Sequence, residues 1–163
     1  MIRHLLPEDT LAFTRLRREY LTNAPLAFAS SPEADPASPD AVRQILENYP
    51  YSVIMGAFDP DLVGAVALYR DPQPKSAHKA HLWGMYVAPS HRGRGIGSRL
   101  LQTALEHARG LAVDWVHLSV TSASPEARRL YERAGFRVWG TEKDALRHDG
   151  GVVDEFYMGM RLI

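Results

Sequence analysis

The sequence predicts an α/β (α+β) protein with a mixed, mostly antiparallel central sheet of about seven strands, flanked by about four helices. Three observations lead to this fold class. Apolar residues recur with a helical period in some segments and form short β-prone runs in others. Proline, glycine and acidic residues separate these segments where helices and strands commonly start and stop. The resulting order is strand, helix, helix, three strands, helix, strand, helix and two strands, unlike a regular doubly wound repeat.

The first third of the chain is predicted to hold one strand and two helices. Residues 1–6 form a short strand that stops at a proline, and the acids that follow favour a helix over about 8–21. A second helix is expected at 39–48. The segment 25–40 contains four prolines. We therefore expect it to form a surface loop or lid.

The middle of the chain is predicted to form three strands. Residues 51–58 and 62–69 are apolar and β-prone, and the sequence Asp59-Pro60-Asp61 between them indicates a hairpin. Residues 80–88 form another strand, which ends before a proline. These strands supply the centre of the expected sheet.

The C-terminal part is predicted to alternate between helices and strands. A helix over 96–110 keeps its apolar residues on one stripe, and a strand follows at 115–120. The helix at 124–134 starts with a serine in the N-cap position, then a proline and an acid in its first turn. Two further strands complete the pattern, at 136–140 and 152–162.

Composition narrows the classes of function. The 163 residues favour one domain over 1–163, and 19 basic and 19 acidic residues give no net charge, which argues against a general nucleic-acid binder. The chain has no cysteine, so disulfides, thiolate zinc sites and a cysteine nucleophile are excluded. It shows neither a signal-peptide pattern nor a run of about 18 apolar residues that could span a membrane. We expect a cytoplasmic protein.

A metal site is not expected. Seven histidines are present, but no HExxH or CxxC pattern occurs. His78 and His81 lie three residues apart in an extended segment, where this spacing points their side chains to opposite faces.

The sequence HRGRGIGSRL, at 91–100, joins a predicted strand to a predicted helix. Glycines let backbone amides approach an anion closely, and a helix N-terminus adds partial positive charge, so a phosphate cradle is the leading interpretation. A plain turn and a basic DNA-reading helix using Arg92, Arg94 and Arg99 are the alternatives. The dinucleotide pattern GxGxxG fails because its third glycine falls at Ser98, and the Walker pattern fails because no lysine follows Gly97.

Two motifs at this point resemble those of a known family. The residues RGRGIG at 92–97 have the form R-x-x-G-x-G and follow a strand that ends in MYVAP. The downstream sequence LYERAGF, at 130–136, is similar to a second hallmark of the same family. Together they resemble the Gcn5-related N-acetyltransferases (GNAT), and the likeness extends over nearly the whole chain, including the loop AFASSPE at 27–33.

The resemblance implies that acetyl-CoA is the cosubstrate and that no metal takes part. The pyrophosphate of acetyl-CoA would lie on the backbone amides of the glycine-rich turn, bordered by Arg92 and Arg94. The pantetheine arm would pair with the main chain of the preceding strand, in a slot where that strand separates from 115–120. Ser124 stands where many members of the family carry an asparagine that binds pantetheine. The residues expected to bind the cosubstrate are Met85, Val87, Arg92, Gly93, Arg94, Gly95, Gly97, Ser98 and Ser124.

For catalysis, the resemblance implies that Tyr131 protonates the departing CoA thiolate, although the residue could instead pack as a core aromatic. An amine acceptor must lose a proton before it attacks, so a general base is needed. His81 and Glu155 are the leading candidates for this base, and Asp154 is a third. Histidine has the more suitable ordinary pKa, but a histidine on a half-buried strand is commonly structural.

The acceptor pocket is expected to involve Phe28, Glu33, Trp83 and the turn at 144–151. The resemblance thus implies transfer of an acetyl group from acetyl-CoA directly to a primary amine of a small molecule or peptide. The acceptors of the family are diverse, and the sequence does not identify this one. A non-catalytic acyl-CoA-binding module on the same fold is the alternative, and the resemblance also allows a homodimer. We expect neither a nucleic acid nor a membrane as a partner.

Overall fold

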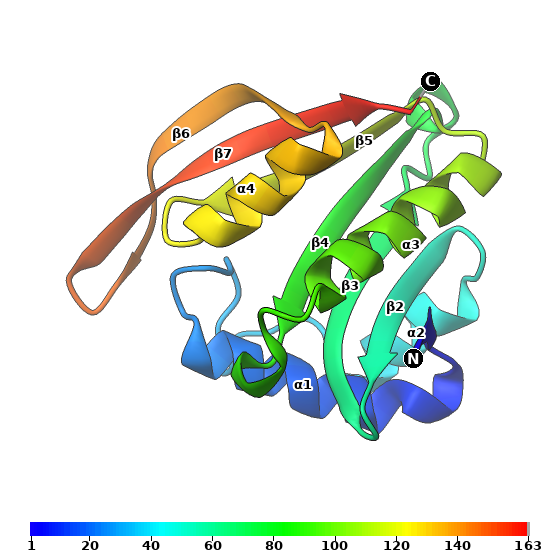
Figure 1. Ribbon diagram of the computed structural model, residues 1–163, viewed down its shortest axis with the longest axis horizontal. Coiled ribbons are helices and arrows are strands. Elements are labelled where there is room, and N and C mark those ends of the chain that lie inside the picture. Colours follow the sequence, from blue (N-terminus) through cyan, green and yellow to red (C-terminus); the bar gives the residue numbers. More distant parts are fainter. Residues whose placement is uncertain (163) are drawn as a thin grey trace.

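The structure is a computed structural model, in which residues 1–162 are described. Seven strands form one mixed sheet in the order β1-β2-β3-β4-β5-β7-β6, with β4 and β5 as its parallel pair (Figure 1). The strands are β1 (Ile2–His4), β2 (Ser52–Phe58), β3 (Leu62–Arg70), β4 (Lys79–Val87), β5 (Trp115–Thr121), β6 (Arg137–His148) and β7 (Gly151–Arg161). The helices are α1 (Thr10–Asn23), α2 (Pro39–Glu47), α3 (Ile96–Gly110) and α4 (Pro125–Ala134). The predicted fold class is confirmed.

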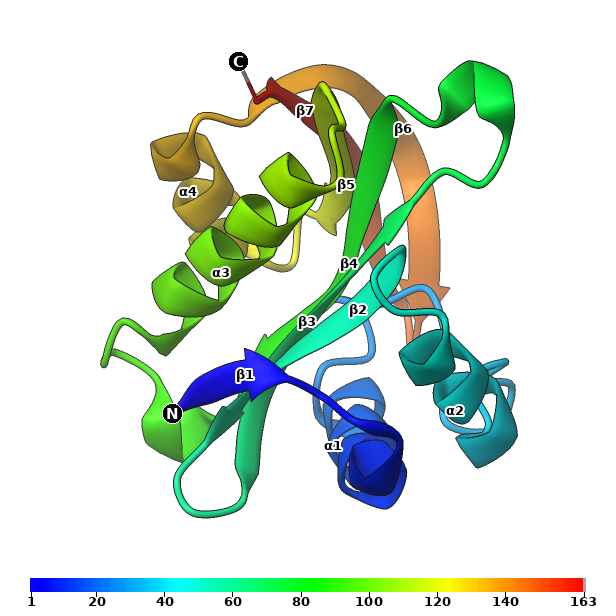
Figure 2. The ribbon, with the colours of Figure 1, turned by 90° about the vertical axis from the view of Figure 1, so that its right-hand side faces the viewer.

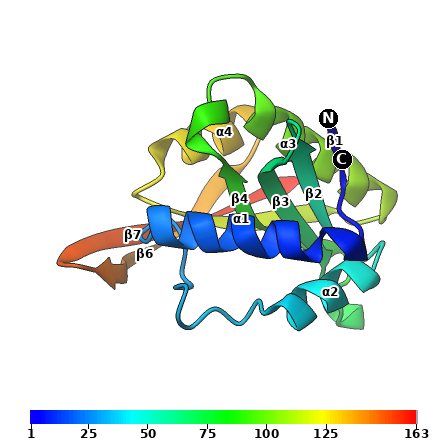
Figure 3. The ribbon, with the colours of Figure 1, turned by 90° about the horizontal axis from the view of Figure 1, so that it is seen from below.

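The helices lie on both faces of the sheet. Helices α1 and α2 lie on one face and α3 and α4 on the other, which Figures 2 and 3 show from two sides. Alternating residues of β3 divide between two cores: Val66 and Leu68 pack on the side of α3, whereas Ala65 and Ala67 pack on the side of α1. This period of two is what a strand buried on both faces requires.

Strands β4 and β5 separate after a short paired segment. Their register pairs join Lys79–His81 to Trp115–His117, and no pair of the described sheet joins the later residues of the two strands. The rest of β4 pairs with β3 on its other side, and the rest of β5 pairs with β7. A gap therefore opens within the sheet, as the family resemblance implied.

A β-bulge in β4 changes which side chains face the gap. Gly84 has a φ of +65°, and Val66 of β3 lies opposite two residues, Gly84 and Met85. In an ideal strand Trp83 and Met85 would share a face. Here Trp83 packs on the side of α1, whereas Met85 packs on the side of α3.

Strand β6 is much longer than the strand predicted at 136–140. Its outer residues are polar and largely exposed, so they show no apolar alternation. Backbone pairing with β7 holds them, and this pairing runs to His148↔Gly151 through two register shifts. Within residues 1–162, no helix is both long and apolar enough to cross a membrane.

Candidate active site

The glycine-rich turn has the geometry of an anion site. Gly93 and Gly95 have φ values of +76° and +75°, a region that residues with a Cβ rarely adopt. A Cβ built on either residue would meet nothing within 4 Å, so the space beside them is open. Gly95 is the N-cap of α3, and its carbonyl accepts the first bond of the helix, from the amide of Arg99 at 3.1 Å. The amides of residues 96–98 therefore have no carbonyl of the helix to bind.

The two arginines of the turn lie against different partners. Arg92 donates from Nε to the carbonyl of Val87 at 2.8 Å, and its guanidinium lies 5.5 Å from the ring centroid of Tyr86. Nη1 of Arg94 lies 3.8 Å from Asp59 of the β2–β3 turn, and the Arg94 side chain is largely exposed. The main chain of Val87 was expected to pair with pantetheine, and its carbonyl thus already accepts one bond.

A groove of about 630 Å³ runs from this turn into the gap in the sheet. Its walls combine the glycine-rich turn, the end of β4 and the start of α4. The cosubstrate residues predicted from sequence line it, except Arg94: Met85, Val87, Arg92, Gly93, Gly95, Gly97, Ser98 and Ser124. Arg94, the exception, belongs to the same turn, so these residues come together at one end of the sheet.

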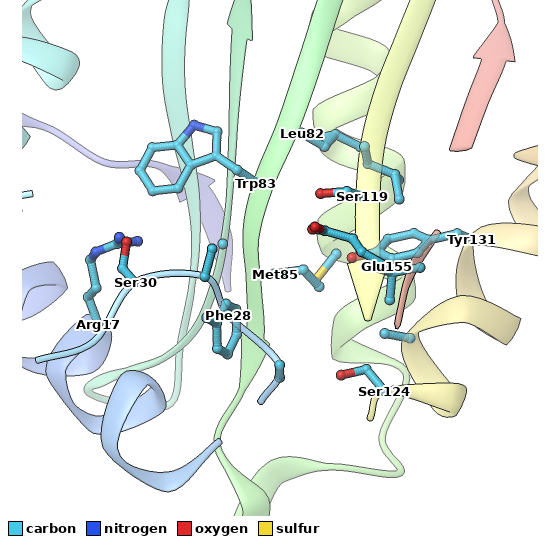
Figure 4. A pocket seen from close by; sticks show the side chains of 16 residues that line it. Arg17, Phe28, Ser30, Leu82, Trp83, Met85, Ser119, Ser124, Tyr131 and Glu155 are labelled. Atoms are coloured by element: carbon cyan, nitrogen blue, oxygen red, sulfur yellow. The ribbon is translucent and has the colours of Figure 1, made fainter. Parts of the chain in front are cut away.

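A second cavity, of about 280 Å³, continues the groove between β4 and β5. The two share five lining residues: Ala27, Phe28, Met85, Ser124 and Ala127. Beyond them the second cavity reaches Trp83, Tyr131 and Glu155 (Figure 4). Side chains from α1, β4, β5, α4 and β7 therefore converge on one continuous space.

Tyr131 lines the second cavity from α4. It is 6% exposed, and its ring packs edge-on against Phe136, with 5.9 Å between the centroids. Burial raises the pKa of the Tyr131 hydroxyl above its ordinary value of 10. The phenol is therefore protonated at neutral pH and can donate a proton.

Glu155 lines the same cavity from β7, where it lies opposite Thr121 of β5. The side chain is half-buried, and its carboxylate points into the cavity (Figure 4). It is without a side-chain hydrogen bond to residues 1–162. The carboxylate is therefore open to a ligand.

Two other predicted residues lie outside both cavities. His81 belongs to the paired segment of β4, before the gap opens; its ring stacks on Tyr69 at 4.9 Å, and its Nε2 lies 3.4 Å from Asp71. Glu33 is exposed on the loop between α1 and α2. The third candidate base, Asp154, accepts bonds from Lys143 and from the amide of residue 144. The turn at 144–151 also contributes no lining residue.

Ser124 is the N-cap residue of α4, as predicted, but its hydroxyl makes no capping hydrogen bond. Its side chain borders both cavities. The hydroxyl is therefore available to a ligand at the junction of the groove and the second cavity.

Arg17 is a cavity residue that the sequence analysis missed. It lies on α1 and is 8% exposed. Its Nε donates to Asp35 at 2.7 Å, and its Nη1 donates to the hydroxyl of Tyr20 at 2.7 Å. The sequence did hold a signal, because position 17 falls on the buried stripe of α1 with Phe13 and Leu16, where a charged residue is unusual.

Comparisons with known proteins identify relatives of this chain. A model of the acetyltransferase (GNAT) family matches residues 13–136. The N-alpha-acetyltransferase RimI of Mycobacterium tuberculosis is 33% identical, with 72% of this chain and 78% of that protein aligned. A structure of yncA, a putative acetyltransferase from Salmonella typhimurium with its cofactor acetyl-CoA, matches with a TM-score of 0.83 at 20% identity, over all of this chain and 94% of that one.

The L-amino acid N-acetyltransferase AaaT of Escherichia coli is 29% identical over 106 residues. That alignment covers 64% of this chain and 65% of AaaT, which is just under two thirds of the relative.

Proposed function

Because this chain belongs to the acetyltransferase (GNAT) family, we propose that it transfers the acetyl group of acetyl-CoA to the primary amine of a small molecule or peptide. One observation carries the proposal: a groove that starts at an open cradle of backbone amides leads to a cavity lined by an acid and a base candidate. The Salmonella neighbour, whose structure is described with acetyl-CoA, shares this fold and supports the choice of donor.

The residues of the groove fit the donor. The positive φ values of Gly93 and Gly95, together with the empty space beside them, leave a cradle that a Cβ would begin to fill. In the proposal, the amides of this turn and of the first turn of α3 hold the pyrophosphate. Met85 and Ser124 line both the groove and the second cavity, where they would guide the pantetheine arm.

Acetyl-CoA supplies an acetyl thioester, whose carbonyl carbon the acceptor amine attacks. Glu155 removes one proton from the acceptor ammonium, directly or through a water, and so produces the neutral nucleophile. As the C–S bond breaks, the hydroxyl of Tyr131 gives its proton to the sulfur. The second proton leaves the amine nitrogen as the C–N bond forms, and it restores the phenol. His81 and Glu33 have no role in this proposal, because both lie outside the cavities.

The test combines binding with turnover. We expect acetyl-CoA to raise the melting temperature of the protein, and we expect amines to release free CoA from acetyl-CoA in its presence. A panel grouped into amino acids, polyamines, aminoglycosides and peptides would reveal the acceptor class. Acetyl-CoA binding without amine-dependent CoA release across the panel would favour the non-catalytic acyl-CoA-binding module and contradict the transferase.

A further inference from the structure

Two side chains of opposite charge face the second cavity from opposite sides. Arg17 reaches it from α1 and Glu155 from β7, and Figure 4 shows the carboxylate of Glu155 pointing into the space that separates them. The proposed reaction uses Glu155 as a base but gives no role to Arg17. Because Arg17 lines the second cavity, we consider what it could bind in the acceptor.

Arg17 is rigidly held but is not saturated. Nε and Nη2 donate to the two carboxylate oxygens of Asp35, at 2.7 and 2.8 Å, and Nη1 donates to Tyr20. A guanidinium has five N–H groups, so among the described residues two of them have no partner. Asp35 does not line the cavity, whereas Arg17 does. The ion pair with Asp35 thus fixes the orientation of the Arg17 guanidinium and leaves N–H donors for a ligand on the cavity side.

The wall of the cavity combines apolar side chains with the hydroxyl groups of Ser30, Ser119 and Ser124. The guanidinium lies 5.3 Å from the ring centroid of Trp83, and Phe28, Leu82 and Met85 line the same space. Its volume of about 280 Å³ is at the small end of ligand sites. The cavity therefore suits a small molecule that carries both an amine and an anionic group, with an apolar part beside them.

We propose that the acceptor is a free α-amino acid, whose ammonium lies beside Glu155 and whose carboxylate accepts hydrogen bonds from the open N–H groups of Arg17. This inference rests on the proposed transferase function and names its substrate class. The side chain of the amino acid packs against Trp83 and Phe28. Before the acceptor enters, water satisfies the open donors of Arg17. An amine without an anionic or acceptor group displaces that water and leaves buried donors unpaired, which the site penalises.

The experiment uses matched pairs of acceptors that differ by one carboxylate. Leucine is compared with 3-methylbutylamine and with leucinamide, and phenylalanine is compared with phenethylamine. The measured quantity is the ratio of kcat/KM for the amino acid to kcat/KM for its decarboxylated partner. We expect this ratio to fall by about 10- to 100-fold in Arg17→Met, as the loss of hydrogen bonds to a charged group implies. Differences in amine basicity cancel because the same pairs are used with each variant.

Asp35→Asn is the matched control. Asp35 lies on the loop between α1 and α2, and its ion pair with Arg17 attaches this loop to α1. Asp35→Asn weakens the attachment just as Arg17→Met does, but it leaves the guanidinium in place. Both variants can lower turnover, but the ratio should fall much further in Arg17→Met, because Asp35→Asn keeps the guanidinium and one side-chain oxygen that can still accept from it. An equal loss with amino acids and amines in Arg17→Met would overturn the inference, because Arg17 would then serve only to hold the loop.

The wild-type protein provides a test that does not depend on the folding of a variant. If 3-methylbutylamine is acetylated as well as leucine, and phenethylamine as well as phenylalanine, the α-amino acid assignment is wrong while the transferase function stands. If neither amines nor amino acids release CoA and acetyl-CoA does not raise the melting temperature, the proposed function itself fails. The two failures are therefore distinguishable.

Discussion

Tyr131 lines the second cavity beyond its junction with the groove, and the residue is only 6% exposed. Because burial raises its pKa, the phenol holds its proton throughout the neutral range. The leaving thiolate is a weaker base than this phenolate, since an ordinary thiol has a pKa of about 8.5, so the phenol assists by hydrogen bonding to the sulfur as the C–S bond breaks, and the proton that the amine nitrogen loses keeps the phenol protonated. We therefore expect Tyr131→Phe to lower kcat by about 100-fold, the lower end of the usual effect of general acid catalysis.

The pH dependence separates this role from simple packing. In the wild type, burial keeps Tyr131 protonated across this range because it raises the pKa of the phenol, so the rate between pH 7 and 9 should rise with the deprotonation of the amine. Tyr131→Phe should lower this curve uniformly and should leave the melting-temperature shift with acetyl-CoA unchanged. A variant with the wild-type rate and profile would identify Tyr131 as a packing residue.

Gly95 tests the proposed pyrophosphate cradle. In Gly95→Glu, a side chain and a negative charge enter the open space beside the turn, and we expect the binding of acetyl-CoA to be lost. The new residue must also adopt a φ of +75°, which costs about 1–2 kcal/mol of folding free energy. Isothermal titration calorimetry measures the binding, and urea unfolding measures the stability.

Gly150 offers a matched control for Gly95. It lies in the β6–β7 turn with a φ of +79°, and a Cβ there would also meet nothing within 4 Å. Gly150→Glu should therefore cost similar stability and leave acetyl-CoA affinity unchanged. Wild-type affinity in Gly95→Glu would contradict the assignment of the cradle.

At the scale of the element, the bulge in β4 determines which side chains reach the cavity. A Cβ on Gly84 would lie 3.1 Å from the hydroxyl of Tyr20, the group that accepts a bond from Arg17. Gly84→Ala therefore combines a left-handed φ with a close contact in the core. We expect a loss of about 2–3 kcal/mol in the free energy of unfolding, within the usual range for strain and overpacking.

Urea unfolding monitored by tryptophan fluorescence tests this expectation. Gly110→Ala is the comparison, because Gly110 is the last residue of α3, has no neighbour within 4 Å of a built Cβ and is not at positive φ. That variant should be neutral or slightly stabilising. If Gly84→Ala is as stable as Gly110→Ala, the bulge does not depend on glycine.

The sequence predicted most helices and strands because their signals, the spacing of apolar residues and the positions of proline and glycine, depend on residues that are close together in the chain. It could not predict the bulge at Gly84, which depends on the register between β3 and β4. It placed His81 with the catalytic candidates because alternation alone cannot tell where β4 leaves β5. It missed Arg17 because the partner Asp35 is 18 residues away, on a loop with no periodic pattern. The features that the sequence did not predict therefore depend mostly on contacts between residues far apart in the chain.

The loop between α1 and α2 is attached to the rest of the protein at two points. Asp35 pairs with Arg17, and the carbonyl of Leu26 accepts a bond from the buried hydroxyl of Thr121 at 2.7 Å. Partial burial alone would raise the pKa of Asp35, but the bonds from Arg17 and from the amide of Ala37 outweigh it and hold the pKa below its ordinary value of 3.8.

A lowered pKa in the folded state means that Asp35 stabilises the fold above the pKa of the unfolded chain. This contribution should be lost as the pH falls below about 4 and through the folded pKa. Asp35→Asn should thus have a lower free energy of unfolding than the wild type at pH 6. At pH 3 the difference between the two proteins should be smaller. Urea titrations at the two pH values measure both quantities, and an equal deficit at pH 3 and pH 6 would contradict this linkage.

At the scale of the whole molecule, the sheet consists of two parts that meet along the short paired segment of β4 and β5. Residues 82–87 of β4 and 118–121 of β5 form the two sides of the gap, and a ligand there contacts both. Binding should therefore stabilise the parts together. At a concentration 100 times its Kd, acetyl-CoA adds about 2.7 kcal/mol to the free energy of unfolding, which corresponds to a rise of about 5–10 °C in Tm for a chain of this size.

Hydrogen exchange distinguishes this bridging from local binding at the glycine-rich turn. If the ligand runs through the gap, amides of both β4 and β5 beside it should exchange more slowly, together with those at the start of α3. Gly95→Glu should show neither the rise in Tm nor the added protection, because its ligand cannot anchor at the turn. Protection restricted to residues 93–98 would mean that the ligand binds at the turn without entering the gap, and the bridging role of the sheet would then be wrong.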